Sequence, residues 1–257
     1  IKEQGDNVFE KVKMPTCVIL LSKGINQTKT DFFTNDNLQL FDKVKTVQLG
    51  KISQTKRGLE IGRGKLNNIG SIKCLSGSNI DIYTIKSEKF IDIETYKTFS
   101  KNDEMFKSPK IMVRETGNKF FATIDYENSI TTRSIYNTRI TDKNYSEEFI
   151  LGIINSSLFY FFFKQFIAPK TNIFPKIRIA QLKELPIPLN VNKTQKQEIE
   201  ELVSQLLQLN KEKQQLTLPN QIEVIEQRIE YAEDKINEII YELYELTEDE
   251  IELIEGK

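Results

Sequence analysis

The last quarter of the chain carries an apolar repeat that constrains its fold more than any other feature. From residue 222 onward, apolar residues alternate steps of three and four positions, at Ile222, Ile225, Ile229, Ala232, Ile236, Ile239, Leu243 and Leu246. The same spacing, typical of a coiled-coil seam, is found at Ile199, Leu202, Leu206 and Leu209. Because Leu218-Pro219-Asn220 interrupts the repeat, we expect residues 194–246 to form two antiparallel helices packed on each other. Thr247 and Glu250 form a capping-box pattern, which predicts a short last helix over residues 247–255.

Before this tail the apolar pattern is that of a β-rich region. Between residues 31 and 140, short β-type runs alternate with Gly, Asn and Ser, and strands are predicted over 44–49, 80–85, 110–113 and 120–124. The last two runs flank Gly117-Asn118, so they are predicted to pair as a hairpin. An apolar run at 16–22 predicts a further strand. The sequence therefore favours an irregular mixed sheet followed by helices.

Residues 145–166 change to helical spacing. Ser146 is a predicted N-cap, and Glu147 and Glu148 occupy the first turn, where the helix dipole favours acids. The apolar part covers fifteen residues and includes Asn155-Ser156-Ser157, which is shorter than the roughly 20 residues of a membrane span. We therefore expect one buried core helix here. Further on, Pro186-Ile187-Pro188 is expected to end the mixed region, because its two prolines disfavour both helix and sheet.

Composition narrows the chemistry that this chain can perform. It contains no histidine, which excludes Ser-His-Asp and Cys-His catalysis and histidine-bound zinc. Cys17 and Cys74 are too few for a disulfide framework and are expected to be buried, reduced thiols. No charged-plus-apolar leader is present at the first residues, which predicts a cytoplasmic protein with no membrane partner.

The formal net charge of −1 conceals two opposite segments. Residues 11–185 contain 28 Lys and Arg against 17 Asp and Glu, a net charge of +11. Residues 186–257 contain 7 against 17, a net charge of −10. Such asymmetry indicates a part that binds a polyanion joined to an acidic part, although two ordinary solvated surfaces would give the same numbers.

Two short motifs resemble catalytic signatures without matching them. In RGLEIGRGKL (57–66) five residues separate Gly58 from Gly64, and leucine follows the lysine, so a phosphate-binding P-loop is not predicted. A basic surface loop is the simpler interpretation. In DIETYK (92–97) the lysine is one place too far from the acids for a PD-(D/E)xK nuclease. This segment is predicted to be a surface strand, and no catalytic residue or metal ligand is assigned.

The remaining candidates are cations and small polar residues spread over many loops. Lys and Arg supply salt-sensitive phosphate contacts, whereas Arg and Asn can also bond base edges with two hydrogen bonds. The predicted DNA-binding residues are Arg57, Arg63, Lys65, Ser76, Asn79, Lys110, Arg114, Asn118, Lys119, Arg133, Arg139, Lys170, Lys176 and Arg178. Among them Arg114 is predicted to read a base or to make a close contact in the groove, and Lys119 is predicted to contact a phosphate. In the alternative, Arg114 pairs with Glu115 or a neighbouring strand and only steadies the hairpin.

The order of these motifs resembles the C-terminal specificity region of TaqI-like DNA adenine-N6 methyltransferases, including fused type IIG restriction–modification enzymes. The matching segments are VFEKVKMPTCVILLSK (8–23), RGLEIGRGKL (57–66), IKCLSGSNIDIYTI (72–85), PKIMVRETGNKFFATID (109–125), SIYNTRI (134–140), LGIINSSLFYFFF (151–163), LKELPIPL (182–189) and INEIIYELYELTEDEIELIE (236–255). The most specific of them lie within residues 109–140.

The resemblance implies an α/β (α+β) fold in three parts. Residues 1–23 would be the last strands of a methyltransferase domain, 24–188 a DNA target-recognition domain with an irregular mixed sheet, and 189–257 an antiparallel helical hairpin. It also implies that duplex DNA and a methyltransferase domain of the same polypeptide are partners. Adenine methylation with S-adenosylmethionine, and any Mg²⁺-dependent cleavage by a type II restriction activity, would belong to domains outside this chain, which itself is expected to hold no cofactor and to be non-catalytic.

Two other functions stay open from the residues alone. The acidic helical tail could make the chain an assembly module, through self-association or a partner subunit. A stand-alone nuclease is the other alternative.

Overall fold

The computed structural model describes residues 2–4, 16–18, 39–99, 104–168 and 175–256. The chain divides into two compact units, residues 1–34 and 35–257, and each is described by itself. In the first unit, β1 (Lys2–Gln4) pairs antiparallel with β2 (Thr16–Val18). The predicted strand at 16–22 is thus observed in its first three residues, and residues 19–22 lie outside the described ones.

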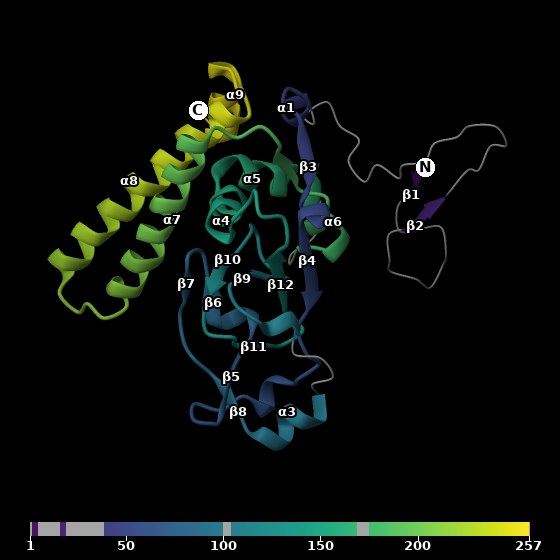
Figure 1. Cartoon of the computed structure of the whole chain (residues 1–257), viewed down its shortest axis with the longest axis vertical. Helices are drawn as coiled ribbons and strands as arrows, with labels where there is room; N and C mark the ends of the chain where they lie inside the picture. The colour runs from purple at the N-terminus through teal and green to yellow at the C-terminus, as the bar shows by residue number, and fades with distance from the viewer. Residues whose placement is uncertain (1, 5–15, 19–38, 100–103, 169–174, 257) are drawn as a thin grey trace. The chain divides into compact units, whose positions relative to one another are not determined.

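A four-stranded antiparallel sheet forms the centre of the second unit (Figure 1). Its strands, in spatial order, are β10 (Ala122–Asp125), β9 (Lys110–Arg114), β12 (Ile135–Ile140) and β4 (Ser53–Arg57). Val113 lies opposite Ala122, so the predicted hairpin between the 110–113 and 120–124 runs is confirmed. Buried Ile111, Met112 and Val113 make β9 the most apolar strand of this sheet, as expected for a strand covered on both faces.

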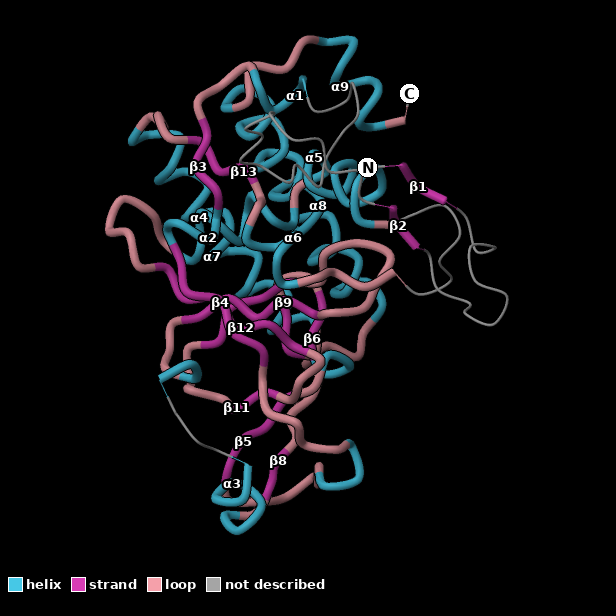
Figure 2. The backbone as a smooth tube through the Cα atoms, turned by 90° about the vertical axis from the view of Figure 1, so that its right-hand side faces the viewer, coloured by secondary structure: helices cyan, strands magenta, loops and turns pink. Residues whose placement is uncertain are grey.

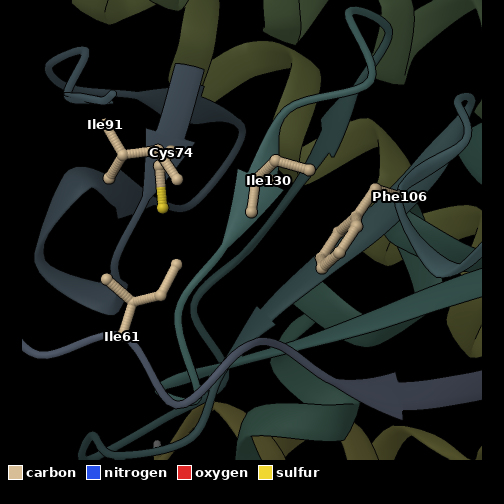
Figure 3. Packing of buried hydrophobic residues seen from close by; sticks show 5 residues of the cluster. All are labelled: Ile61, Cys74, Ile91, Phe106 and Ile130. Atoms are coloured by element: carbon tan, nitrogen blue, oxygen red, sulfur yellow. The ribbon is translucent and has the colours of Figure 1, made fainter. Parts of the chain in front are cut away.

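Smaller sheets extend this centre. β5 (Ile72–Leu75) lies between β11 (Ile130–Thr131), to which it is parallel, and β8 (Phe90–Ile91), to which it is antiparallel. Around them Ile61, Cys74, Ile91, Phe106 and Ile130 form a separate apolar core (Figure 3). Burial raises the pKa of the Cys74 thiol to about 12, so this cysteine is a protonated core residue, as predicted.

Two local predictions in this part are wrong, and each has a local cause. Residues 80–85 form two short strands, β6 (Ile80–Asp81) and β7 (Thr84–Ile85), because Tyr83 turns the chain with a φ of 53°. Residues 92–97 belong to helix α3 (Ile93–Phe99) instead of a strand. Asp92 begins this helix, since its carboxylate accepts hydrogen bonds from Thr95 N at 2.6 Å and Thr95 Oγ1 at 3.1 Å.

The mixed region ends at Pro186-Ile187-Pro188, as predicted, because only helices follow among the described residues, but the two prolines do not prevent a strand. They lie in β13 (Pro186–Pro188), which pairs antiparallel with β3 (Thr46–Gln48). Leu49 N donates to Leu185 O and Leu189 N donates to Lys45 O, both at 2.9 Å. Hydrogen-bonded pairs alternate along an antiparallel ladder, so the prolines occupy positions where β3 requires no N–H donor.

The predicted helix at 145–166 is present but broken. α4 (Glu147–Asn155) begins at Ser146, whose Oγ accepts a hydrogen bond from Phe149 N at 3.2 Å, as predicted. Ser156 then adopts an extended backbone and caps α5 (Ser157–Phe162), which continues as a π-helical turn over Phe163–Ile167. No single helix among the described residues is long and apolar enough to cross a membrane. The bent pair 147–155 and 157–167 passes that test together, and its apolar side chains are mostly buried inside this unit.

The tail forms the predicted pair of helices, α7 (Lys193–Lys213) and α8 (Pro219–Leu243), side by side in Figure 1. The short helix α9 (Glu248–Glu255) follows, and Thr247 N donates to Glu250 Oε2 at 2.7 Å in the predicted capping box. α7 packs on α4, where a Cβ at Gly152 would lie 2.7 Å from Ile199 Cγ2. Figure 2 shows these helices at one end of the unit, with α3, β5 and β8 at the other.

Aromatic rings join helical segments that are far apart in the chain, and one of them also reaches a strand. The Phe41 ring of α1 (Gln39–Asp42) meets Phe159, Phe162 and Tyr244 edge-on, with centroids 5.3–5.8 Å apart. The buried Tyr244 hydroxyl donates to Pro186 O at 2.7 Å. α2 (Leu49–Ile52) and α6 (Ile179–Lys183) complete the unit. The predicted fold class, an irregular mixed α/β domain followed by helices, is confirmed.

Candidate nucleic-acid interface

Cations from four segments meet at one end of the four-stranded sheet. β4 ends at Arg57 and β9 ends at Arg114, and both residues lie beside the start of β12, opposite Tyr136 and Ile135. Arg133 immediately precedes β12. Lys119 lies in the loop 115–121 that joins β9 to β10, and Lys176 bridges to Thr116 of that loop. We call Arg57, Arg114, Lys119, Arg133 and Lys176 the cationic rim.

Arg57 is the most constrained member of the cationic rim. Its Nη2 contacts Glu115 Oε1, and its Nε donates to Arg133 O at 2.8 Å. Its side chain remains 43% exposed, whereas that of Glu115 is 14% exposed. The hydrogen bond to Glu115 raises the pKa of Arg57 above its usual value. The guanidinium is therefore held in one orientation at the surface.

The loop 115–121 is fixed by close packing and by backbone bonds. Gly117 lies directly on the Phe121 ring, and a Cβ at Gly117 would lie 2.6 Å from that ring. The same ring has the Arg114 guanidinium 5.1 Å and the Lys119 Nζ 5.8 Å from its centroid. Gly117 N donates to Pro175 O at 3.1 Å, and Ile177 N donates to Glu115 O at 2.9 Å. Glycine is needed here for a close approach.

The outer cations of this end are solvated. Arg133 Nη1 donates to Glu60 Oε2 at 2.9 Å, and both side chains are more than 60% exposed. Lys176 and Arg178 are exposed on the segment that follows Pro175, and Arg178 immediately precedes helix α6. Exposed donors of this kind are available to an anionic ligand.

Two polar candidates close to this end are buried. Ser76 and Asn79 are 3% and 4% exposed and bond each other, with Ser76 N donating to Asn79 Oδ1 at 2.8 Å. Asn79 Nδ2 donates to Ser87 Oγ at 2.9 Å. They are not available as DNA-binding residues in this structure, because their polar groups close the turn Gly77–Asn79. Asn118, at the tip of loop 115–121, is exposed.

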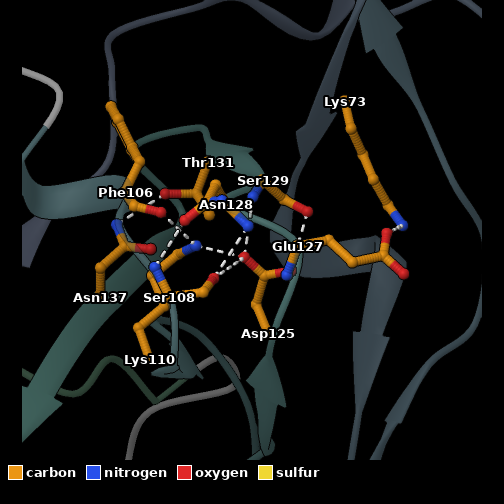
Figure 4. Close-up of polar contacts among 10 residues, drawn as sticks. All are labelled: Lys73, Phe106, Ser108, Lys110, Asp125, Glu127, Asn128, Ser129, Thr131 and Asn137. Carbon is orange, nitrogen blue, oxygen red and sulfur yellow. Dashed lines mark hydrogen bonds and ion pairs between the residues drawn. The ribbon is translucent and has the colours of Figure 1, made fainter.

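Lys110 is also wrong as a DNA contact, because it lies inside the protein at the opposite end of β9 (Figure 4). Its Nζ pairs with Asp125 and donates to Phe106 O at 2.9 Å, and both charged side chains are fully buried. Burial lowers the pKa of Lys110. Burial alone would raise the pKa of Asp125, but Lys110 and two hydrogen bonds from Ser129 hold it below its usual value.

Two other candidates, Arg139 and Lys65, lie away from the cationic rim. Arg139 is near the opposite end of β12, where its Nη1 donates to Glu104 O at 3.1 Å. Lys65 lies in the short turn Arg63–Lys65, with its Nζ 5.9 Å from the Phe99 ring centroid of α3. The Arg63 side chain and Lys170 lie outside the described residues. Their roles stay predictions.

Helix α8 of the tail lies opposite the loop 115–121. A cavity of about 310 Å³ has Asn118 and Lys119 on one side and Glu233 and Asn237 of α8 on the other. Asn155 also lines it, and its buried Oδ1 has no hydrogen-bond partner among the described residues. Burial raises the pKa of Glu233. One side of the loop thus faces the helical hairpin across this cavity, which no sequence pattern indicated.

The sequence does not indicate that Glu115 is the partner of Arg57. Glu115 adjoins Arg114 in the chain, whereas the observed ion pair joins residues 58 positions apart. The one available signal was an acid inside a segment otherwise rich in cations. An acid there is unexpected if the segment faces a polyanion, and it calls for a partner.

Comparison with known proteins agrees with this fold. Residues 72–187 match the family described as the TaqI-like C-terminal specificity domain, which confirms the predicted family for that segment. No curated protein sequence matches the chain. Among solved structures, the type IIL restriction–modification enzyme MmeI in complex with DNA is similar, with 13% identity and a TM-score of 0.51 over 79% of this chain and 35% of that chain.

Two further solved structures are similar at a lower level. The type I restriction–modification S subunit from M. genitalium has 16% identity and a TM-score of 0.45, over 66% of this chain and 40% of that chain. The type IIG restriction endonuclease BpuSI has 11% identity and a TM-score of 0.47, over 80% and 32%. At these identities a likeness concerns the fold alone. The chain spans less than half the length of each of these three proteins.

Proposed function

We propose that this chain recognises a sequence in duplex DNA for a restriction–modification methyltransferase, because residues 72–187 match the TaqI-like C-terminal specificity domain. The methyltransferase domain of the same polypeptide would be its partner. Methylation with S-adenosylmethionine, and cleavage where the parent protein performs it, would be carried out by domains outside this chain.

The observation that carries the proposal is the convergence of the cationic rim. Five cations from positions between 57 and 176 lie at one end of one sheet, together with the exposed amide of Asn118. Phosphate contacts need Lys and Arg at the surface, and base contacts need planar groups such as guanidinium and amide. The rim offers both kinds of group within one region.

Within this proposal the individual roles follow from side-chain chemistry. Arg114 stacks on Phe121, and its planar fork suits two hydrogen bonds to a base edge in a groove. Lys119, Arg133, Lys176 and Arg178 would contact phosphates, which a compact or mobile cation serves well. The helical hairpin at 189–257, acidic overall, would hold the loop 115–121 in place and keep DNA on the other side of it.

The test is duplex binding by the 257-residue chain across a salt series. We expect log Kd to rise linearly with log salt concentration, with a slope that reflects several released counterions. A triple variant, R57A/R114A/K176A, should lose most of this binding. K97A/K107A is the matched control, because both lysines are exposed away from the rim and pair with glutamates at i−3.

A chain that binds duplex DNA weakly and without salt dependence would contradict the proposal. That result, combined with association of the purified chain with itself or with a subunit, would favour the assembly module instead. Equal losses in the triple variant and in the control would place the DNA contacts somewhere other than the cationic rim.

A further inference from the structure

Glu115 is an acid in the middle of the cationic rim, and its position calls for an explanation. A carboxylate beside DNA phosphates is repelled, so a random surface acid here would weaken binding. Glu115 is instead largely buried, and its backbone is tied on both sides, with its N donating to Ser134 O and its O accepting from Ile177 N, both at 2.9 Å. The backbone bonds keep Glu115 at the rim, and its carboxylate there contacts Arg57.

The contacts of Arg57 show what this fixed carboxylate does. Nε and Nη2 lie along one edge of the guanidinium, and both are engaged, by Arg133 O and by Glu115 Oε1. Nη1 makes no hydrogen bond to any described residue. The end of the fork formed by Nη1 and the second hydrogen of Nη2 is therefore turned away from these partners, on a side chain that is 43% exposed.

We propose that Arg57 is a specificity-determining residue that reads a guanine, and that Glu115 is its positioning residue. The proposal rests on the proposed function and deepens it. An arginine fork presents two parallel N–H donors, which match the O6 and N7 acceptors of guanine in the major groove. Held along one edge, the fork has less rotational freedom to lose on binding. It also cannot easily turn toward the acceptors of another base, so discrimination between bases is sharper than for a free arginine.

The same end of the sheet contains a second arginine–glutamate ion pair, which serves as a matched control. Arg133 and Glu60 also form an ion pair, but both side chains are more than 60% exposed. Arg133 contacts its partner through Nη1, and its fork is not held along the Nε edge by any described residue. Glu60 should therefore not affect which sequence is bound.

The experiment is selection of bound duplexes from a randomised DNA library by the 257-residue chain, followed by sequencing, with E115Q, R57K and E60Q in parallel. Each protein is also titrated with one mixed-sequence duplex. We expect E115Q to lower the preference for guanine at one position of the selected site by roughly tenfold, within the range of one bidentate contact. Binding of the mixed-sequence duplex by E115Q should be as tight or tighter, because one repulsive charge is gone.

R57K keeps the charge and removes the fork, so it should relax the same position as E115Q while leaving the mixed-sequence affinity within about twofold. R57K also tests the proposal if E115Q is unstable, because a lysine at position 57 can still pair with Glu115. E60Q should select the same sequence as the parent chain.

The outcomes separate the two proposals. If the parent chain selects a sequence and both E115Q and R57K select that sequence with unchanged preference at every position, the roles of Arg57 and Glu115 are refuted while DNA recognition stands. If E115Q weakens specific and mixed-sequence binding by the same factor, Glu115 is a structural residue only. If the parent chain selects no sequence at all, both this inference and the proposed function fail.

Discussion

The two ends of the four-stranded sheet each hold a cation–carboxylate pair, and the two pairs differ in almost every physical respect. At one end Lys110 and Asp125 are both fully buried. At the other, Arg57 is 43% exposed beside Glu115. A single strand, β9, contributes to both ends, with Lys110 as its first residue and Glu115 just after its last.

The buried pair is part of a closed network. Asp125 accepts hydrogen bonds from Ser129 N at 2.8 Å, Ser129 Oγ at 2.9 Å, Ser108 Oγ at 3.2 Å and Glu127 N at 3.2 Å (Figure 4). A desolvated charge is tolerated only when its bonding groups are satisfied in this way. Arg57, by contrast, leaves part of its guanidinium to the solvent. Burial, and not residue type, therefore distinguishes a structural cation from one that can bind a ligand.

The largest expected effect comes from breaking the buried pair. Asp125→Asn leaves the Lys110 ammonium in the interior with no counter-ion, and we expect a loss of about 3–5 kcal/mol in the free energy of unfolding. Lys110→Met should cost less, because the carboxylate keeps its donors from Ser108, Glu127 and Ser129. Denaturant unfolding monitored by circular dichroism measures both. Arg57→Met, the equivalent change at the exposed pair, should cost about 1 kcal/mol or less.

A loss below about 1 kcal/mol in the free energy of unfolding for Asp125→Asn would contradict the expected difference between the buried and the exposed pair. In that case the Lys110–Asp125 pair would be no more important for folding than a surface ion pair.

The second effect is on acid stability. The pKa of Asp125 in the folded protein lies below its value in the unfolded chain, so the unfolded state binds more protons as the pH falls. The stability contributed by the pair is therefore complete above about pH 4, the ordinary pKa of an aspartate, and is lost as the pH decreases through the lower folded value. Thermal melting between about pH 7 and pH 2.5 should show this decrease in the parent chain. The Asp125→Asn variant should not show this acid-dependent loss of stability. If the melting temperatures of the two proteins change identically with pH, Asp125 is not the source of the loss.

The third effect is confined to DNA binding and compares two cations on one aromatic ring. Arg114→Ala should cost roughly 1–3 kcal/mol on the preferred sequence and relax one position of the site. Lys119→Ala should weaken all sequences about equally and reduce the salt slope by about 1. Library selection and salt titration of each variant distinguish the two results. If Arg114→Ala binds DNA normally but melts earlier, Arg114 only steadies the hairpin.

The smallest effect is expected for the most exposed pair. Glu60→Gln removes the partner of Arg133, and both side chains are more than 60% exposed. Solvent and salt screen such a pair, so the change in the free energy of unfolding should stay below about 0.5 kcal/mol. A larger loss, measured in the same denaturant series, would mean that this end of the sheet depends on its ion pairs as the buried end does.

Several parts of the fold could be predicted from the sequence because their causes lie within a few residues. The three-four apolar spacing identified α7 and α8, and the pattern of Thr247 and Glu250 identified the start of α9. Ser146 was recognisable as the N-cap of α4. The strands β9 and β10 follow from two apolar runs joined by a short loop. Helix periodicity, caps and hairpins are local, so the sequence expresses them directly.

The candidate site depended on contacts that no local pattern contains. The sequence supplied the types of residue, and it determined that residues 11–185 are cationic and that the tail is acidic. Only the tertiary structure decided that Lys110 is buried, that Ser76 and Asn79 bond each other, and that Arg57 meets Glu115 across 58 positions. The reason is that strand order and register set which residues become neighbours, and these are properties of the whole sheet and not of any single strand.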